Sequence, residues 1–153
     1  MEARGVWKGG FETRLDDGRG HGVTIDLPSD EGGSDAGTSS LELLVLSLAG
    51  CIITIFGLVA AKRRLTFEGL TVSLTANRPP RSPTIQAVRG RLTVRTEATR
   101  EEVEAVARLT LRTCPVGVLF ERANVPIELS VEITPSPPTP QDGVPRPSAP
   151  EPT

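Results

Sequence analysis

Apolar and polar residues alternate with a period of two in three windows of the chain, which is typical of half-buried β-strands. The windows are residues 70–76, 88–95 and 127–133. A fourth strand is predicted at residues 23–27. Residues 6–15, with the turn Asp16-Asp17-Gly18, indicate a hairpin that precedes it.

Two helices are predicted from capping-box spacing, in which a hydroxyl residue is followed three positions later by glutamate. Ser39 and Glu42 have this spacing in front of a long apolar run. Thr99 and Glu102 have it again, in front of apolar residues at helical intervals. The sequence therefore predicts one long helix and one amphipathic helix.

A third, short helix is predicted to begin at Cys114-Pro115, because proline is favoured in the first turn of a helix. Its end is expected near Asn124, which tolerates the left-handed conformation, and Pro126 follows just beyond. The resulting order is strands, long helix, strands, two helices and a strand. It indicates an α+β fold with a mostly antiparallel sheet.

The chain has 153 residues, and its last nineteen differ in composition from the rest. Residues 135–153 are rich in proline and have almost no apolar side chains, so they cannot offset the entropy of ordering. We expect one folded domain over residues 1–134 and a disordered Pro-rich tail over residues 135–153.

Residues 43–61 contain no charged side chain and are followed by Lys62-Arg63-Arg64. Length and flank both fit a transmembrane helix. The alternative is a helix that is buried on all sides. In a chain this short, such a helix is buried most easily inside an oligomer, and the neighbouring amphipathic strands favour that alternative.

The composition of the chain argues against several classes of function. The net charge is −2, there is no long basic run, and aromatic residues make up 3% of the chain. These features argue against a nucleic-acid partner. The N-terminus lacks the apolar core of a signal peptide, so we expect a cytoplasmic protein. Structural disulfides are uncommon in the cytosol, which leaves inert or catalytic roles for the two cysteines.

Cys51 and Cys114 are the candidate chemical groups. Cys51 lies in the middle of the apolar helix, where burial would leave an unreactive thiol. Cys114 lies at a helix N-terminus, where unpaired N–H groups favour an anion. The pair together suits a thiol peroxidase, in which one sulfur attacks the O–O bond and the other resolves the sulfenic acid.

Other site classes fit the residues less well. His21 is the only histidine, and no Cys-x-x-Cys motif is present, so a four-ligand zinc site would need carboxylates. A serine hydrolase would require that same histidine. His21 is interpreted as part of a surface turn, and neither a metal nor another cofactor is expected.

Glu42 has two interpretations. It completes the capping box with Ser39, or its carboxylate holds an arginine beside a thiolate. Arg14 and Arg19, in the predicted N-terminal hairpin, are the candidate arginines, and an ordinary exposed position is favoured for Arg19.

The residues around both cysteines resemble motifs of the OsmC/Ohr family. The segments that carry the resemblance are Ser40-Leu41-Glu42-Leu43-Leu44, Ser47-Leu48-Ala49-Gly50-Cys51, Thr113-Cys114-Pro115-Val116-Gly117-Val118-Leu119-Phe120, Ala123-Asn124-Val125-Pro126-Ile127, and Trp7 with Gly9-Gly10. They span roughly residues 4–134, and the two cysteine helices occur in the family's order.

The resemblance implies an intertwined homodimer whose long cysteine helices pack at its centre, which removes the need for a membrane. It implies that Cys51 is the peroxidatic cysteine and Cys114 the resolving one, the reverse of what their local contexts indicate. Arg14 of one chain would then meet the cysteines of the other, with Glu42 as a candidate to orient it. The implied activity is thiol-dependent reduction of organic hydroperoxides in oxidative or osmotic stress, with an external thiol reductant. The alternative is a dimer that binds a small apolar or thiol ligand without turnover.

Overall fold

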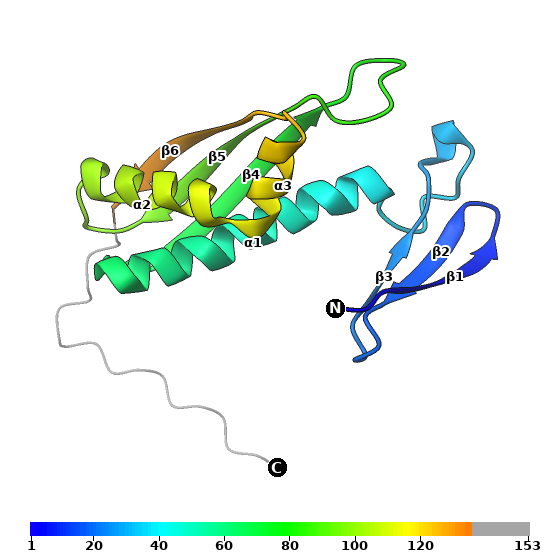
Figure 1. The fold of residues 1–153 in the computed structure, drawn as a ribbon, viewed down its shortest axis with the longest axis horizontal. Helices are drawn as coiled ribbons and strands as arrows, with labels where there is room; N and C mark the ends of the chain where they lie inside the picture. Colours follow the sequence, from blue (N-terminus) through cyan, green and yellow to red (C-terminus); the bar gives the residue numbers. More distant parts are fainter. Residues whose placement is uncertain (136–153) are drawn as a thin grey trace, which may run out of the picture.

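The computed structural model describes residues 1–135. Within them the chain forms three α-helices and two three-stranded sheets, so the predicted α+β class is confirmed (Figure 1). In chain order the elements are β1 (Arg4–Gly9), β2 (Glu12–Asp16), β3 (Gly22–Ile25), the 3-10 helix η1 (Ser29–Glu31), α1 (Ser40–Arg63), β4 (Gly69–Asn77), β5 (Ala87–Arg95), α2 (Arg100–Thr113), α3 (Pro115–Arg122) and β6 (Ile127–Thr134).

The C-terminal sheet has the order β4-β5-β6 and forms the body of the molecule. β4 pairs with β5 antiparallel, as a hairpin requires. β6 pairs with β5 in parallel, from Val88 opposite Ile127 to Arg95 opposite Thr134. The parallel pair arises because α2 and α3 carry the chain back along the sheet before β6 begins, and such a return is the usual connection between parallel strands. Three of the strand pairings are antiparallel, in agreement with the predicted mostly antiparallel arrangement.

The three helices lie on one face of this sheet, and the core lies between the two layers (Figure 1). The inward residues of β5 are fully buried, whereas the intervening arginines are exposed. Arg89 pairs with Glu128 at 2.8 Å, and Arg91 with Glu132 at 3.3 Å. Because these exposed ion pairs contribute little to stability, packing of the buried face holds the body together.

α1 is the central helix, and it begins at the predicted capping box. Ser39 accepts the backbone N–H of Glu42, and the Glu42 carboxylate accepts the backbone N–H of Ser39. One stripe of the helix is buried against the sheet and the other helices: Leu48, Ile52, Phe56, Val59 and Ala60. Other apolar residues of α1 are exposed in the single chain: Leu44, Leu46, Ile53 and Leu58.

α1 is also the one helix of the described region that is long and apolar enough to cross a membrane. Its buried stripe shows that part of the apolar surface belongs to the protein core. The exposed apolar residues on the same helix are left uncovered by the single chain.

The N-terminal sheet contains the predicted hairpin. Its strands are β1 and β2, which turn back on each other at Gly9 and Gly10. Gly9 has φ of 125° and Gly10 has φ of 54°, in the left-handed region where glycine has no steric cost. A register shift between Trp7 and Gly9 accompanies the turn. The predicted turn at Asp16–Gly18 also exists, and it joins β2 to β3.

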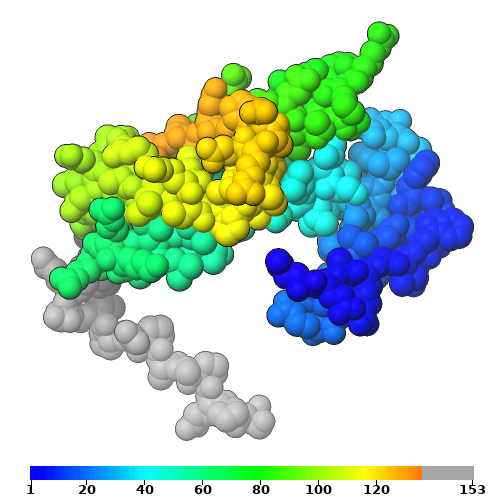
Figure 2. All heavy atoms as spheres, in the orientation of Figure 1, coloured from blue at the N-terminus to red at the C-terminus, as the bar shows by residue number. Residues whose placement is uncertain are grey.

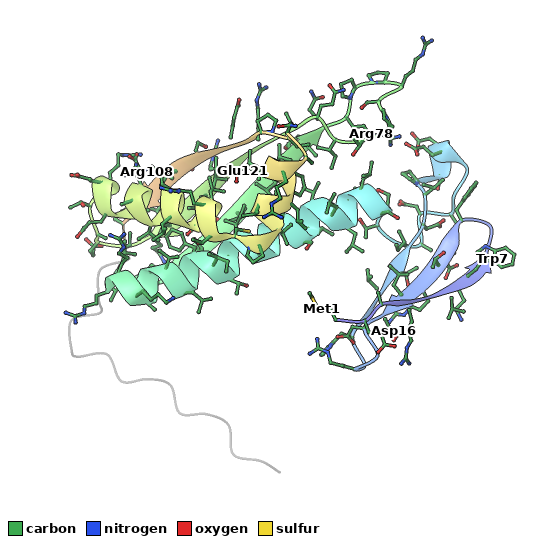
Figure 3. All side chains as sticks on the ribbon, viewed as in Figure 1. Met1, Trp7, Asp16, Arg78, Arg108 and Glu121 are labelled. Atoms are coloured by element: carbon green, nitrogen blue, oxygen red, sulfur yellow. The ribbon has the colours of Figure 1, made fainter. Side chains whose placement is uncertain are left out.

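The sheet β1-β2-β3 forms a lobe of its own, separate from the body (Figure 2). It packs little against the helices or the other sheet of its own chain. Trp7 points away at the outer part of this lobe and is 72% exposed (Figure 3). The lobe therefore lacks an apolar partner within the single chain.

Asp26 organises the segment that links the N-terminal lobe to α1. Its side chain is buried and accepts the backbone N–H groups of Leu27, Ser34 and Ala36, together with the Ser34 hydroxyl. The Ser34 hydroxyl bond, followed by the backbone bonds, lowers the pKa of Asp26 to about 2. One carboxylate thus satisfies three backbone N–H groups of the loop, in addition to the backbone bonds within it.

Replacing Asp26 with asparagine is expected to loosen the loop, since an amide NH₂ would face backbone donors. The native pKa lies below the ordinary value of 3.8, so stabilisation by the carboxylate is present above that pH and is lost as pH falls toward 2. Amide hydrogen exchange over residues 27–38 should therefore be faster in D26N at neutral pH, and the wild type should approach it in acid. The exposed residue Asp30 provides the control D30N. Equal protection in D26N and wild type would contradict the assignment.

The predicted Pro-rich tail, residues 135–153, lies outside the described residues except for Pro135.

Candidate active site

Cys51 lies near the middle of α1 and is partly exposed. Its neighbours Leu48 and Ile52 belong to the fully buried stripe of the helix. Cys51 therefore lies at the border of this stripe, partly buried and packed against the core. The expectation of a buried thiol is therefore correct only in part.

Cys114 lies between two helices: it is the C-cap of α2 and the N-cap of α3. Pro115 occupies the first turn of α3, as predicted. The Cys114 sulfur accepts the backbone N–H of Gly117 at 3.3 Å, in the manner of a capping serine. The side chain is fully buried, with 0% exposure, so solvent reaches Cys51 but not Cys114.

The structure brings the two cysteines together. Although they are 63 positions apart in the chain, their Sγ atoms lie 2.7 Å apart, and both are free thiols. The contact occurs because the α2–α3 junction packs on α1. At this distance the pair can share a proton, and a sulfenic acid on one sulfur would lie within reach of the other.

The two thiols are electrostatically unequal. Burial, together with the hydrogen bond and charge interaction with Cys51, raises the pKa of Cys114 to about 11. The Gly117 N–H opposes this shift but does not cancel it. Cys114 is therefore protonated near neutral pH, despite its place at a helix N-terminus. The expectation from sequence that this position favours a thiolate is wrong, because desolvation outweighs the helix dipole.

Glu42 is engaged in capping. Its carboxylate accepts the Ser39 backbone N–H at 2.7 Å and contacts the Thr38 hydroxyl at 3.3 Å. The bonds to Ser39 lower the pKa of Glu42. Within the single chain, its carboxylate does not contact an arginine among residues 1–135.

Arg14 lies on β2, and its guanidinium donates to the Thr24 hydroxyl on β3 at 3.3 Å. Because the N-terminal lobe packs little on α1, the single chain does not bring Arg14 to the cysteines. Of the four candidate site residues, the structure thus unites Cys51 and Cys114 and leaves Glu42 and Arg14 apart from them.

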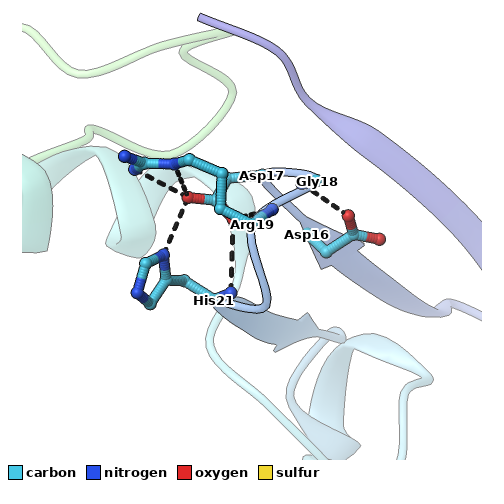
Figure 4. Close-up of polar contacts among 5 residues, drawn as sticks. All are labelled: Asp16, Asp17, Gly18, Arg19 and His21. Atoms are coloured by element: carbon cyan, nitrogen blue, oxygen red, sulfur yellow. Dashed lines mark hydrogen bonds and ion pairs between the residues drawn. The ribbon is translucent and has the colours of Figure 1, made fainter.

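The turn between β2 and β3 contains a local polar cluster centred on Asp17 (Figure 4). Asp17 Oδ2 accepts Arg19 Nε at 2.9 Å and contacts His21 Nδ1 at 2.9 Å. The bond from His21, followed by that from the Arg19 backbone, lowers the pKa of Asp17 to about 2. His21 is exposed, in agreement with a surface turn, and Arg19 is occupied by its ion pair with Asp17.

Gly117 is the site residue that the sequence analysis did not single out. Its backbone N–H contacts the Cys114 sulfur. The signal was available, because an N-cap side chain accepts the N–H two or three positions further on, and Gly117 is three residues after Cys114.

An open groove of about 1180 Å³ runs along the first half of α1. It is lined by the loop before the helix, by Val45 and Ala49 of α1, and by Leu74 and its neighbours on β4. β4 is an outer strand of its sheet, so its free edge borders this groove. The groove lies beside the exposed apolar residues of α1, the helix that carries Cys51. The rest of residues 1–135 leaves both uncovered.

The fold and the cysteine pair define a small α+β protein with a dithiol at the junction of a long central helix and two shorter ones. Residues 32–130 match the family model described as OsmC-like protein. The chain belongs to the OsmC-like family, as its cysteine motifs indicate.

Solved structures share this fold. The OsmC-like protein from Mycoplasma pneumoniae is 15% identical, with a TM-score of 0.77 over 86% of this chain and 95% of that chain. The organic hydroperoxide resistance protein OsmC from Legionella pneumophila is 19% identical, with a TM-score of 0.71 over 86% and 95%. The organic hydroperoxide resistance protein from Elizabethkingia anophelis is 17% identical, with a TM-score of 0.68 over 86% and 94%. No curated protein sequence gives a significant match to the chain.

Proposed function

We propose that this protein is a cytoplasmic thiol-dependent peroxidase that reduces organic hydroperoxides. The observation that carries the proposal is the close contact between the partly exposed Cys51 and the buried Cys114. Two structural neighbours that carry the name organic hydroperoxide resistance protein support the choice of substrate.

Exposure assigns the roles in this proposal. A peroxide from solvent meets Cys51 first, and the Cys51 thiolate attacks the terminal oxygen. The O–O bond breaks, the alkoxide takes a proton and leaves as an alcohol, and Cys51 becomes a sulfenic acid. Cys114 then attacks the Cys51 sulfur, water leaves, and a disulfide forms. An external thiol reductant returns both cysteines to the reduced state.

The proposal is tested by peroxide turnover with a dithiol reductant in excess. We expect the wild-type protein to consume cumene hydroperoxide catalytically, and to consume it faster than hydrogen peroxide because the surroundings of Cys51 are apolar. Consumption no faster than in a protein-free control would reject the proposal. In that case the groove along α1 would favour the alternative, a protein that binds a small apolar ligand.

We also propose that the working form is a homodimer. The N-terminal lobe has exposed apolar side chains, Val6, Trp7 and Phe11, and little contact with its own body. The exposed apolar residues of α1 and the groove beside β4 supply matching surface on a second copy. Sedimentation of the untagged protein without detergent should give the mass of a dimer. A monomer, or recovery only from the membrane fraction, would contradict this.

Arg14 is the arginine that the proposed dimer would supply to Cys51 of its partner. It makes no ion pair within residues 1–135, whereas Arg19 is held by Asp17. A guanidinium beside the reacting atoms would stabilise the thiolate and the departing alkoxide. We expect R14A to lower peroxide turnover by about 10²-fold, which is typical for loss of one charge-stabilising donor. The matched control R19A should retain activity, and equal losses in the two variants would contradict the assignment.

A further inference from the structure

Within residues 1–135, the sulfur of Cys51 has one close polar neighbour, the thiol of Cys114. The nearest charged residues on α1 are Glu42 and Lys62, nine and eleven positions away. β4, which packs against α1, carries no titratable side chain. In the single chain, these two elements therefore place no charge beside Cys51.

The helices α2 and α3 also pack against α1, and their charged groups point outward. At the end of α2 and along α3 these groups are Arg108, Arg112, Glu121 and Arg122, all of them exposed. The remaining charges of α2, Arg100, Glu101, Glu102 and Glu104, lie in its first turns, at the end far from Cys114. Within residues 1–135 of its own chain, the Cys114 thiol is thus the group that can stabilise a negative charge on Cys51.

Cys114 has the geometry of a donor to Cys51. Its sulfur accepts the Gly117 N–H at 3.3 Å, and this bond fixes the side-chain orientation at the start of α3. Its sulfur lies 2.7 Å from the Cys51 sulfur, and the side chain is fully buried. A proton on Cys114 can therefore be donated to the sulfur of the partly exposed Cys51.

We propose that Cys114 has a role that precedes its resolving step: its S–H donates to the Cys51 sulfur and stabilises the thiolate that attacks. Cys114 is then a positioning residue for the nucleophile in addition to the resolving cysteine, and its catalytic consequence rests on the proposed peroxidase function. When Cys51 has become a sulfenic acid, the same proton leaves with the hydroxyl group as water, and the disulfide forms without an external acid.

The raised pKa of Cys114 agrees with this role. Burial and the neighbouring Cys51 hold that pKa at about 11, so Cys114 keeps its proton while Cys51 attacks. A proton retained on Cys114 also prevents that sulfur from reacting with peroxide itself, because the thiolate is the reactive form.

Two substitutions separate donation from resolution. C114S keeps a hydroxyl donor but cannot form the disulfide, whereas C114A removes both. The rate of Cys51 alkylation by iodoacetamide is measured against pH in wild type, C114S and C114A, with the modified residue identified by peptide mass. We expect the midpoint of the profile in C114S to stay near that of wild type. In C114A it should move upward by about one pH unit, a tenfold change that corresponds to about 1.4 kcal/mol.

Equal midpoints in all three proteins, or the same shift in C114S and C114A, would overturn the proposal. Infrared spectroscopy of the wild type gives a second test that does not depend on the folding of a variant. As Cys51 ionises, the remaining S–H stretching band should move to lower frequency, since that S–H then donates to an anion. An unchanged band would also overturn the proposal.

The alkylation assay contains no peroxide, so it distinguishes this inference from the proposed function. A shift in C114A alone, in a protein that does not turn over peroxide, would support donation by Cys114 and reject the peroxidase. Peroxide turnover with an unshifted C114A profile would reject donation and leave the peroxidase in place.

Discussion

Replacing Cys51 with serine should reduce peroxide consumption by several orders of magnitude, to the protein-free background. A serine hydroxyl does not ionise near neutral pH and does not form a sulfenic acid, so the attack on the O–O bond is lost. The buried Cys114 cannot substitute, because it is 0% exposed and its pKa is raised to about 11. Initial rates of cumene hydroperoxide loss, with a dithiol reductant in excess, provide the measurement.

C114S is the matched control for this prediction. It retains Cys51 and, when mixed with peroxide in the absence of reductant, should consume about one equivalent. Without the resolving thiol, Cys51 should then remain as a sulfenic acid or proceed to the sulfinic acid. The two variants should therefore differ in the first turnover. Full activity in C51S, or an identical loss in both variants, would contradict the assigned roles.

Replacing Phe56 with alanine should lower the free energy of unfolding more than the other substitutions named here. Phe56 is fully buried in the stripe of α1 that faces the core. Its ring meets that of Phe67 edge to face, with centroids 5.6 Å apart. Because Phe67 lies between α1 and β4, this contact joins the helix to the start of the sheet. Deleting the ring should cost about 3–5 kcal/mol, as for other buried Phe-to-Ala changes.

A loss of this size is a large part of the 5–15 kcal/mol or so that stabilises a typical domain. Guanidinium unfolding at fixed protein concentration measures it, since the stability of a dimer depends on concentration. F56L preserves most of the side-chain volume and should lose considerably less than F56A. A loss below about 1 kcal/mol in F56A would be typical of a surface substitution and would contradict the assigned core.

The helices were predictable because their signals are local. Both capping boxes occur where the sequence places them, at Ser39 and at Thr99. The proline after Cys114 starts α3, and Asn124 has the left-handed conformation expected beyond the end of that helix. These features depend on residues within one or two turns of each other, so no tertiary information is needed to find them.

The structural features that the sequence pattern did not predict depend on residues that are distant in the chain or on competing local effects. The parallel pairing of β5 with β6 follows from how α2 and α3 pack, which a period-two pattern does not encode. The hairpin at residues 6–15 was predicted, but its turn at Gly9-Gly10, where both glycines have positive φ, was not located.

The candidate site was predictable only in its chemistry. Sequence singled out Cys51 and Cys114, but their separation of 2.7 Å arises from tertiary packing. Local context gave Cys114 the reactive role, whereas burial in the folded chain gives it the raised pKa. The roles of Arg14 and Glu42 remain predictions, because their proposed meeting involves a second copy of the chain.

We propose that Cys51 and Cys114 form one redox pair that peroxide oxidises. The most direct test is to treat the fully reduced protein with one equivalent of cumene hydroperoxide, block the remaining thiols and map the cysteine peptides by mass spectrometry. We predict the loss of two hydrogen atoms per chain and one peptide pair, Cys51 joined to Cys114 within the same chain. Recovery of Cys51 and Cys114 on separate peptides, both carrying the blocking group, would contradict this pairing.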